Sequence, residues 1–502
     1  MHLSKDNLEN IKTPGVVKPG PGIFNLPEKV LQFGTGVLLR GLPDYFIDKA
    51  NRQGIFNGRI VVIKSTESGD AGPFERQDGL YTLCIRGIED GKKGEENIIC
   101  SAISRVLSAR DQWQEVLRCA HNPELQVIIS NTTEVGIQLV EDDIRKAPPS
   151  SFPGKLLAFL YERYGVFGGS AESGMVIVPT ELIPDNGKKL AAILKELAVI
   201  SGLEAAFITW LGNHCRFCNS LVDRIVPGRP DTATMQQLQH DLGYTDELLA
   251  ISEVYRLWAI EGDEKVRSVL SFAQADPGVI IRPDIGIYRE LKLRLLNGTH
   301  TLSCGLAFLA GFGTVKTAMD NADFSAFVAG LMLNEIAPAI PYKLDLGEAK
   351  DFGLSVLDRF RNPFIQHQWI SITMQYSSKI RMRDVPVLLQ HYTQQDTAPG
   401  HFSLGFAAYL LFMRAVRKEK DVYQGESHGQ FYPINDDKAG LYYELWKNHA
   451  ADEVVMLALK DESLWGTDLT RLKGFAEAVR GKLDLLMKKG VAPALHAEMS
   501  KM

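Results

Sequence analysis

A lysine, an asparagine and a histidine stand close together in the middle of the chain, and together they could carry out proton transfer. They are Lys292, Asn297 and His300, in the run of residues 288–300. On an α-helix, which turns by about 100° per residue, Asn297 would lie roughly 140° and His300 roughly 80° round from Lys292. The three side chains would therefore point into one half of the helix surface.

Hydride transfer at a carbonyl carbon without a metal is the chemistry that suits these residue types. A lysine can donate and accept the proton when burial or a nearby positive charge lowers its pKa from about 10.4. Arg289 could supply that charge. Asn297 would donate a hydrogen bond to the alkoxide, and His300 would hold the same oxygen or its neighbour. The structural alternative is an exposed lysine, an Asn-Gly turn and a core histidine.

A glycine turn near the N-terminus could hold a dinucleotide. An apolar stretch precedes Gly34, Thr35 and Gly36, which predicts a strand, a tight turn and a helix. Gly34 and Gly36 would let the backbone approach a pyrophosphate, and the helix N-terminus would offer free N–H groups. Leu39 stands where the third glycine of the dinucleotide-binding fingerprint would be, so an ordinary tight turn is the alternative.

A second predicted strand, residues 59–64, follows at the distance expected for a β-α-β unit. The loop after it contains Glu67 and Asp70, either of which could bind the ribose hydroxyls, and we select Asp70. No arginine lies between Lys64 and Glu75, which favours NAD over its 2′-phosphorylated form, although Lys64 leaves that form open.

A third predicted strand, residues 125–130, leads into a polar loop that contains Asn131, Thr132 and Thr133. Parallel sheets bind ligands at the edge where the strands end, so these three residues are candidate cofactor ligands. A further strand at residues 175–178 is followed by an amphipathic helix. This alternation predicts an α/β fold with a Rossmann-like, doubly wound parallel sheet.

The chain divides into two predicted domains, residues 1–280 and 281–502, at a stretch with two Pro-containing turns. Beyond the boundary the apolar spacing is that of helices. The expected helices cover residues 301–310, 322–335, 402–416, 439–449, 451–460 and 472–488. Lys292 would thus open a mainly helical second domain, and a cleft between the domains would be the natural active site.

Composition argues against several other classes of protein. The net charge of -6 and the lack of a basic tail argue against a nucleic-acid partner. The longest apolar stretches are too short to span a membrane, and the polar N-terminus has no signal-peptide core. Six cysteines in so long a chain favour the reducing cytoplasm. Cys215 and Cys218 beside His214 lack a second ligand pair for zinc, so we expect no metal.

These dispersed motifs resemble those of the polyol-specific long-chain dehydrogenases, the mannitol dehydrogenase family. The likeness rests on the glycine turn, on residues 219–225, and on the family's Lys-x4-Asn-x2-His pattern, which begins at Lys292. It covers nearly the whole chain. Within the family, the chain is most like the members that reduce a keto sugar acid, and the similar runs are residues 32–34, 77–81, 130–134, 181–183, 221–226 and 359–363.

The resemblance implies an NADH-dependent, metal-independent and reversible reduction of D-tagaturonate to D-altronate, a step in bacterial galacturonate breakdown, with Lys292 as general acid. Leu182 stands where mannitol-type members have an oxyanion-site asparagine. Arg289 replaces a glutamate, and Ser371 replaces an arginine that contacts sugar hydroxyls. These exchanges suit a substrate that ends in a carboxylate, because a buried anion needs a paired cation.

Several cations are candidates for binding that carboxylate: Arg289, Arg361, His367 and the alternating run 377–383. We select Lys379, because the family keeps a lysine after a Ser-Ser pair, and keep Arg289 and His367 as further substrate ligands. The Lys-x-Arg-x-Arg alternation could instead be the solvated face of an extended segment.

Three other functions remain open. Fructuronate reduction or polyol oxidation would leave the fold and the lysine unchanged, although Leu182, Arg289 and Ser371 argue against mannitol. A non-catalytic dinucleotide-binding regulator would have no reason to keep the lysine, asparagine and histidine together. A metal-dependent sugar isomerase would need a cluster of carboxylates and histidines, which the sequence does not show. The oligomeric state is left open.

Overall fold

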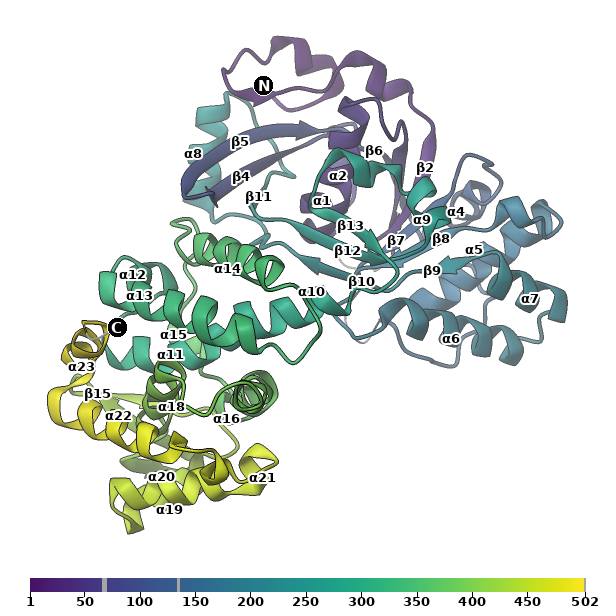
Figure 1. The fold of residues 1–502 in the computed structure, drawn as a ribbon. Coiled ribbons are helices and arrows are strands. Elements are labelled where there is room, and N and C mark those ends of the chain that lie inside the picture. Colours follow the sequence, from purple (N-terminus) through teal and green to yellow (C-terminus); the bar gives the residue numbers. More distant parts are fainter. Residues whose placement is uncertain (66–69, 133–135, 501–502) are drawn as a thin grey trace. The chain divides into compact units, whose positions relative to one another are not determined.

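The computed structural model describes residues 1–65, 70–132 and 136–500, and the chain falls into two compact units (Figure 1). Unit 1 comprises Met1–Gly87 and Lys93–Ile285, and unit 2 comprises Ile88–Lys92 and Gly286–Met502. Two of the candidate cofactor ligands, Glu67 and Thr133, lie outside the described residues.

Unit 1 is built on a six-stranded parallel sheet with the strand order β6-β3-β2-β7-β8-β9. Numbered along the chain, this order is 3-2-1-4-5-6, the arrangement of dinucleotide-binding Rossmann folds. The predicted doubly wound sheet is therefore confirmed. Its strands are β2 (Glu28–Phe33), β3 (Arg59–Lys64), β6 (Ile103–Ser108), β7 (Val127–Ser130), β8 (Val176–Pro179) and β9 (Arg216–Phe217).

Both faces of this sheet are covered, which explains why its strands are apolar without alternation. Val30 and Ile129 face one core, whereas Leu31 and Ile128 face the other. Figure 1 shows α5, α6 and α7 grouped together beside β8 and β9. The first core contains α1 (Val37–Gly41) and α2 (Pro43–Arg52), and the second contains α4 (Trp113–Cys119), α5 (Phe152–Val166), α6 (Asn186–Ile200) and α7 (Ala205–Asn213).

Two smaller sheets, which the apolar patterns did not predict, complete the core on the side of α1 and α2. Trp258 on β12 is fully buried, and its ring stacks on Phe272 with the centroids 5.6 Å apart. One sheet contains β1 (Val16–Val17), β5 (Lys92–Cys100), β4 (Tyr81–Glu89) and β11 (Ala250–Glu253), and the other contains β10 (Ser220–Asp223), β12 (Leu257–Glu261) and β13 (Val279–Arg282).

Unit 2 is mainly helical, as predicted. It opens with α10 (Gly286–Leu291), a π-helix (Lys292–Gly298) and α11 (Thr299–Leu309), and continues with α13 (Ala322–Gly330), a second π-helix (Leu331–Ile336), α14 (Leu346–Phe360), α16 (Tyr376–Arg383), α18 (Gly400–Phe412), α19 (Ala439–Asn448), α20 (Ala451–Lys460) and α22 (Phe475–Lys489). None of the described helices combines the length and the apolar character that a bilayer span demands.

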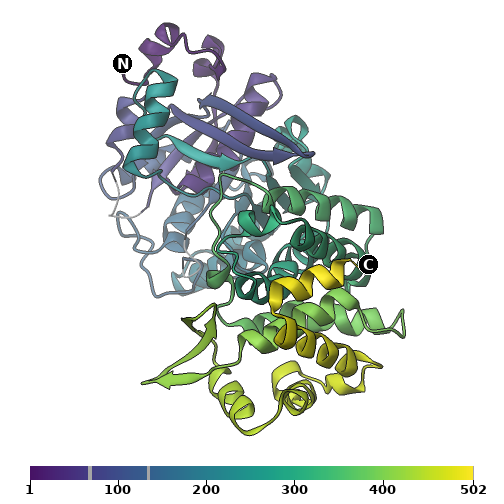
Figure 2. The same ribbon diagram turned by 90° about the vertical axis from the view of Figure 1, so that its left-hand side faces the viewer.

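An antiparallel three-stranded sheet interrupts the helices of unit 2, and the sequence analysis did not predict it. It consists of β14 (Arg417–Glu419), β15 (Val422–Ser427) and β16 (Gln430–Pro433). These strands are the yellow-green arrows of Figure 2. Their side chains are mostly polar and partly exposed, so they lack the apolar run by which the buried strands of unit 1 were recognised.

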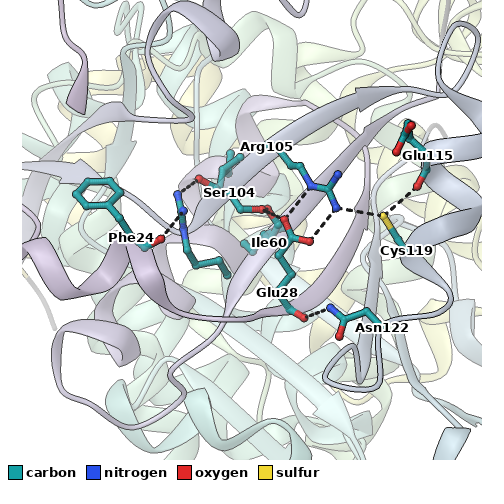
Figure 3. Close-up of polar contacts among 10 residues, drawn as sticks. Phe24, Glu28, Ile60, Ser104, Arg105, Glu115, Cys119 and Asn122 are labelled. Carbon is teal, nitrogen blue, oxygen red and sulfur yellow. Dashed lines mark hydrogen bonds and ion pairs between the residues drawn. The ribbon is translucent and has the colours of Figure 1, made fainter. Parts of the chain in front are cut away.

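An ion pair joins the start of β2 to β6, at the end of the sheet opposite the glycine turn (Figure 3). Glu28 Oε1 accepts hydrogen bonds from Ser104 Oγ at 2.8 Å and Arg105 Nε at 2.9 Å, and Glu28 Oε2 accepts one from Arg105 Nη2 at 2.9 Å. Burial acts to raise the pKa of Glu28, but the hydrogen bonds from Arg105 and Ser104 outweigh it and the pKa is lowered. The folded state therefore stabilises the ionised carboxylate.

We expect Glu28→Gln to reduce the free energy of unfolding by about 1 kcal/mol at pH 7, since the charge-assisted pair is partly screened by solvent. Because the folded pKa lies below the unfolded one, this stabilisation is present above the unfolded pKa of about 4.3 and is lost as the pH falls through the folded value. Urea unfolding at pH 7 and at acid pH measures both effects.

The control is Glu124→Gln, which changes an exposed glutamate. An equal loss of stability for Glu28→Gln at both pH values would show that packing, rather than the charge, is responsible.

Candidate active site

Lys292 and Asn297 lie in a π-helix rather than in the α-helix that their spacing was taken to predict. The π-helix spans Lys292–Gly298, and after it Thr299 N–H donates to the carbonyl of Arg294, five residues earlier. The hydrogen bonds of a π-helix join residues i and i+5, so these two residues lie on about the same side of the helix. Asn297 therefore follows Lys292 on the same side, where an α-helix would have separated the two by about 140°. The helix was predicted correctly, but its predicted geometry was wrong.

His300 lies in the first turn of α11 and is buried against aromatic rings. Its ring stacks on Phe360, with the centroids 3.9 Å apart and an interplanar angle of 18°. The rings of His367 and Trp369 meet it edge-on, with centroids at 5.3 and 5.6 Å. Among the described residues, none hydrogen-bonds to Nδ1 of His300. This ring nitrogen is thus a polar atom that a ligand could satisfy.

Positive charge surrounds this histidine. Burial holds the pKa of His300 well below its usual range, and the charges of His367, Arg359 and Arg383 lower it further. The imidazole is therefore neutral at pH 7. A neutral imidazole can still donate or accept a hydrogen bond at a substrate oxygen.

Lys379 and Arg383 belong to the same group of cations. Burial lowers the pKa of Lys379, and Arg383 lowers it further. Desolvation and the charge of Lys379 lower the pKa of His367, although more than a third of that residue is exposed. Lys379 Nζ donates to the carbonyl of Ile372 at 2.9 Å. These side chains act on one another's pKa, so His300, His367, Lys379 and Arg383 form one cluster.

The run that contains Lys379 is a helix, α16, and not the extended segment considered from its alternation. Residues four apart share a helix face, so Lys379 and Arg383 lie together. Arg381 is exposed and donates to the carbonyl of Ser463 at 3.2 Å.

Other candidate cations have different surroundings. Arg361 donates to Ser325 Oγ at 3.3 Å and lies 3.9 Å from Asp358, and neither contact involves the cluster. Arg289 is half-buried on α10, one turn before the π-helix. Sequence reasoning gave no role to Arg359, and it counted Arg383 only as one cation of the candidate run 377–383. The 359–363 run and the Lys-x-Arg-x-Arg alternation contained the signal, but only the helix assignments show which cations share a face.

Gly34 lies where the strand order of the large sheet reverses, between β2 and β7. Its N–H donates to Ile63 O at 3.0 Å, and Asn131 N–H donates to Phe33 O at 3.1 Å. Its φ is +129°, and a Cβ here would lie 2.9 Å from Leu39 Cδ1 and 3.0 Å from Asn131 O. Only glycine fits, and the buried Leu39 packs against it in place of the third glycine.

Thr35 and Gly36 follow this turn at the carboxyl edge of the sheet. Among the described residues, no atom apart from those of its chain neighbours lies within 4 Å of a Cβ built on Gly36, so the backbone there is open to a ligand. The helix after it is short, because α1 has only five residues and Pro43 begins α2. The predicted helix dipole is thus that of little more than one turn, and the open glycine backbone is the feature that fits a pyrophosphate.

The side chains of Asn131 and Thr132 hold their own loop. Asn131 Nδ2 donates to Thr180 Oγ1 at 3.0 Å. Thr132 N and Oγ1 donate to Glu181 Oε1 at 2.8 and 3.0 Å. Glu181 is buried and also accepts from Ser130 Oγ at 3.2 Å. Sequence reasoning assigned no role to this glutamate, although it lies in the 181–183 run of family likeness.

Asp70 and Leu182 are exposed near the same edge. Asp70 Oδ1 accepts a hydrogen bond from Gly72 N at 2.8 Å, so one oxygen of this carboxylate supports α3 (Gly72–Arg76). Leu182 follows β8, and 63% of its surface is exposed. Its side chain offers no hydrogen-bond donor at the position where the resemblance implies an asparagine in mannitol-type members.

Cys215 and Cys218 are both buried, and burial raises the pKa of each thiol to about 12. The thiols are therefore protonated at neutral pH. Within the described part of the chain, no three metal-binding side chains come together.

Both units match models of known protein families. The Mannitol dehydrogenase Rossmann domain model matches residues 28–272, and the Mannitol dehydrogenase C-terminal domain model matches residues 284–487. The altronate oxidoreductase of Shigella flexneri is 36% identical over 479 residues, which covers 94% of this chain and 96% of the relative. That of Halalkalibacterium halodurans is 36% identical over 487 residues, covering 95% and 94%.

Solved structures show the same fold. Pseudomonas fluorescens mannitol 2-dehydrogenase, in a ternary complex with NAD and D-mannitol, matches with a TM-score of 0.64 and 23% identity, covering all of both chains. A substrate-free D-sorbitol dehydrogenase matches with a TM-score of 0.76 and 20% identity, covering 99% of this chain and 100% of the other. From the two family models and the relatives, the chain belongs to the mannitol dehydrogenase family.

Proposed function

We propose that this chain is an NAD-dependent oxidoreductase that reversibly reduces D-tagaturonate to D-altronate. The observation that carries the choice of a sugar acid is the pair of cations near His300 and His367, namely Lys379 and Arg383, which lie one helical turn apart on α16. Like charges at close range are costly unless an anion offsets them. A neutral polyol would leave that repulsion in place, whereas a substrate carboxylate would relieve it.

Lys292 is the proposed general acid in the reducing direction and the general base in the reverse direction. NADH, when bound, supplies the hydride. Lys292 gives its proton to the carbonyl oxygen, and the Asn297 amide, one π-turn further on, donates a hydrogen bond to the same oxygen as it gains negative charge. The neutral His300 can hold a neighbouring hydroxyl or the same oxygen through its ring nitrogen. Lys379 is the proposed ligand of the carboxylate, with His367 and Arg289 as further substrate ligands.

The glycine turn fits a dinucleotide. Gly34 allows the tight turn and Gly36 leaves the backbone open beside Thr35, at the point of the sheet where Rossmann folds bind the pyrophosphate. Asp70 is the proposed ribose ligand, and Asn131 and Thr132 shape the neighbouring loop. Relatives named altronate oxidoreductase, at 36% identity over most of the chain, support the proposed substrate.

We expect Lys292→Ala to lower kcat for tagaturonate by about 10³-fold, because general acid catalysis is lost, while the Kd of NADH stays within about twofold. Steady-state kinetics and fluorescence titration with NADH measure the two quantities. Lys343→Ala, which changes an exposed lysine of the same unit, is the control. Near-normal turnover by Lys292→Ala would refute its role.

Lys379→Met should raise the KM for tagaturonate by about 10- to 100-fold, the cost of losing one charged hydrogen bond. Turnover of fructose, which has no carboxylate, should change much less. The matched variant is Arg361→Met. If Arg361→Met shows the selective loss and Lys379→Met does not, the carboxylate is bound by the other cation.

Asp70→Ala should weaken NADH binding about tenfold through the lost ribose contact, with the sugar KM unchanged. Glu75→Ala, an exposed acid in the following helix, is the control. If the Kd of NADH does not change in Asp70→Ala, the ribose contact lies elsewhere.

A further inference from the structure

The carbonyl of Asn297 has donors outside the regular helix ladder, at the point where the π-helix gives way to α11. Thr301 Oγ1 donates to it at 2.7 Å, and Arg383 Nη1 lies 3.4 Å from it. Arg383 Nη1 also donates to Thr301 Oγ1 at 3.0 Å. Backbone groups at a change of ladder need such partners. Arg383 therefore contacts the backbone of the residue whose amide is proposed to bind the reacting oxygen.

Arg294 lies within the π-helix, and its side chain binds the backbone at the end of α16. Its Nη1 donates to the carbonyls of Met382 and Arg383, both at 2.7 Å, and its Nε donates to Glu290 Oε2 at 2.9 Å. The last carbonyls of an α-helix have no partner within the helix. Two guanidinium groups thus join the π-helix and the C-terminal end of α16, one in each direction.

The charges of both guanidinium groups act on one buried acidic side chain, that of Asp384. Asp384 is fully buried, and neither of its carboxylate oxygens has a hydrogen-bond partner among the described residues. A Cβ on Gly298 would lie 2.7 Å from Asp384 Oδ1, so glycine is needed for the carboxylate to approach the π-helix. Burial raises the pKa of Asp384, and the charges of Arg383 and Arg294 act against that rise. Gly298 thus serves close packing rather than the turn that Asn-Gly usually marks.

We propose that Arg383 is a positioning residue: with Thr301 it holds the last turn of the π-helix, and so keeps the Asn297 amide on the same side as Lys292. This inference rests on the proposed function, because it uses Asn297 as the donor to the reacting oxygen. A regular α-helix would move Asn297 about 140° round the axis from Lys292. A misplacement of about 1 Å in a catalytic group can already cost about 10²-fold in rate.

The kinetic test compares Arg383→Ala and Arg383→Lys with Arg381→Ala, which lies on the exposed face of the same helix. We expect kcat per NADH-binding site to fall about 10²-fold in Arg383→Ala. Arg383→Lys should keep part of the rate, and added guanidinium ion should restore part of it to Arg383→Ala. Arg381→Ala should stay within about twofold of the wild type. A purely structural role would reduce the number of NADH-binding sites but leave kcat per site unchanged.

The second test needs no substrate. Amide hydrogen exchange should speed up in the peptide that covers residues 292–299 of Arg383→Ala, with the peptides of α20 and α22 unchanged, and Arg381→Ala should show no such change. If the wild type turns over neither sugar acids nor fructose, the proposed function fails, and the exchange experiment still decides whether Arg383 holds the π-helix. Unchanged exchange at residues 292–299, or an unchanged kcat per site, would overturn the inference.

Discussion

A short stretch of helix whose hydrogen bonds span five residues rather than four sets the geometry of the candidate active site. The π-helix Lys292–Gly298 brings a lysine and an asparagine to one side of the backbone, although their spacing would separate them on an α-helix. Such a turn is poorly stabilised by its own ladder, so it depends on its surroundings. Arg294 and Arg383 supply these surroundings, and Gly298 allows the buried side chain of Asp384 to come close.

The position of Arg383 beside the π-helix also explains why positive charge gathers at the candidate site. Arg383 contacts the π-helix and also lies one helical turn from Lys379, whose charge in turn acts on His367. His300 is kept neutral among these cations by burial. Placing cations of like charge close together costs free energy, and a ligand with a negative charge would offset that cost. The cluster therefore supports the proposal of a sugar acid over a neutral polyol.

Much of the fold could be predicted, because it depends on local patterns. The apolar runs of the buried strands and the spacing of the long helices are visible without tertiary information, and they indicated the parallel sheet and the helical second unit. The π-helix could not be predicted in this way. Its apolar spacing resembles that of an α-helix, and the choice between the two depends on contacts with α16, which is distant in sequence. The strands β14–β16 could not be predicted either, because their mostly polar side chains form no apolar run.

The sequence indicated which types of residue make up the candidate site, but it did not show which of them contact one another. The structure brings His300, His367 and Lys379 together. It also gives Asn131 and Thr132 a part in holding their loop through Thr180 and the buried Glu181, which pattern alone could not show. The most direct test of the account is the rate of NADH oxidation by the wild type with tagaturonate, fructuronate and fructose in one buffer that contains a chelator. The account predicts fast turnover of tagaturonate and little with fructose; a preference for fructose would contradict it.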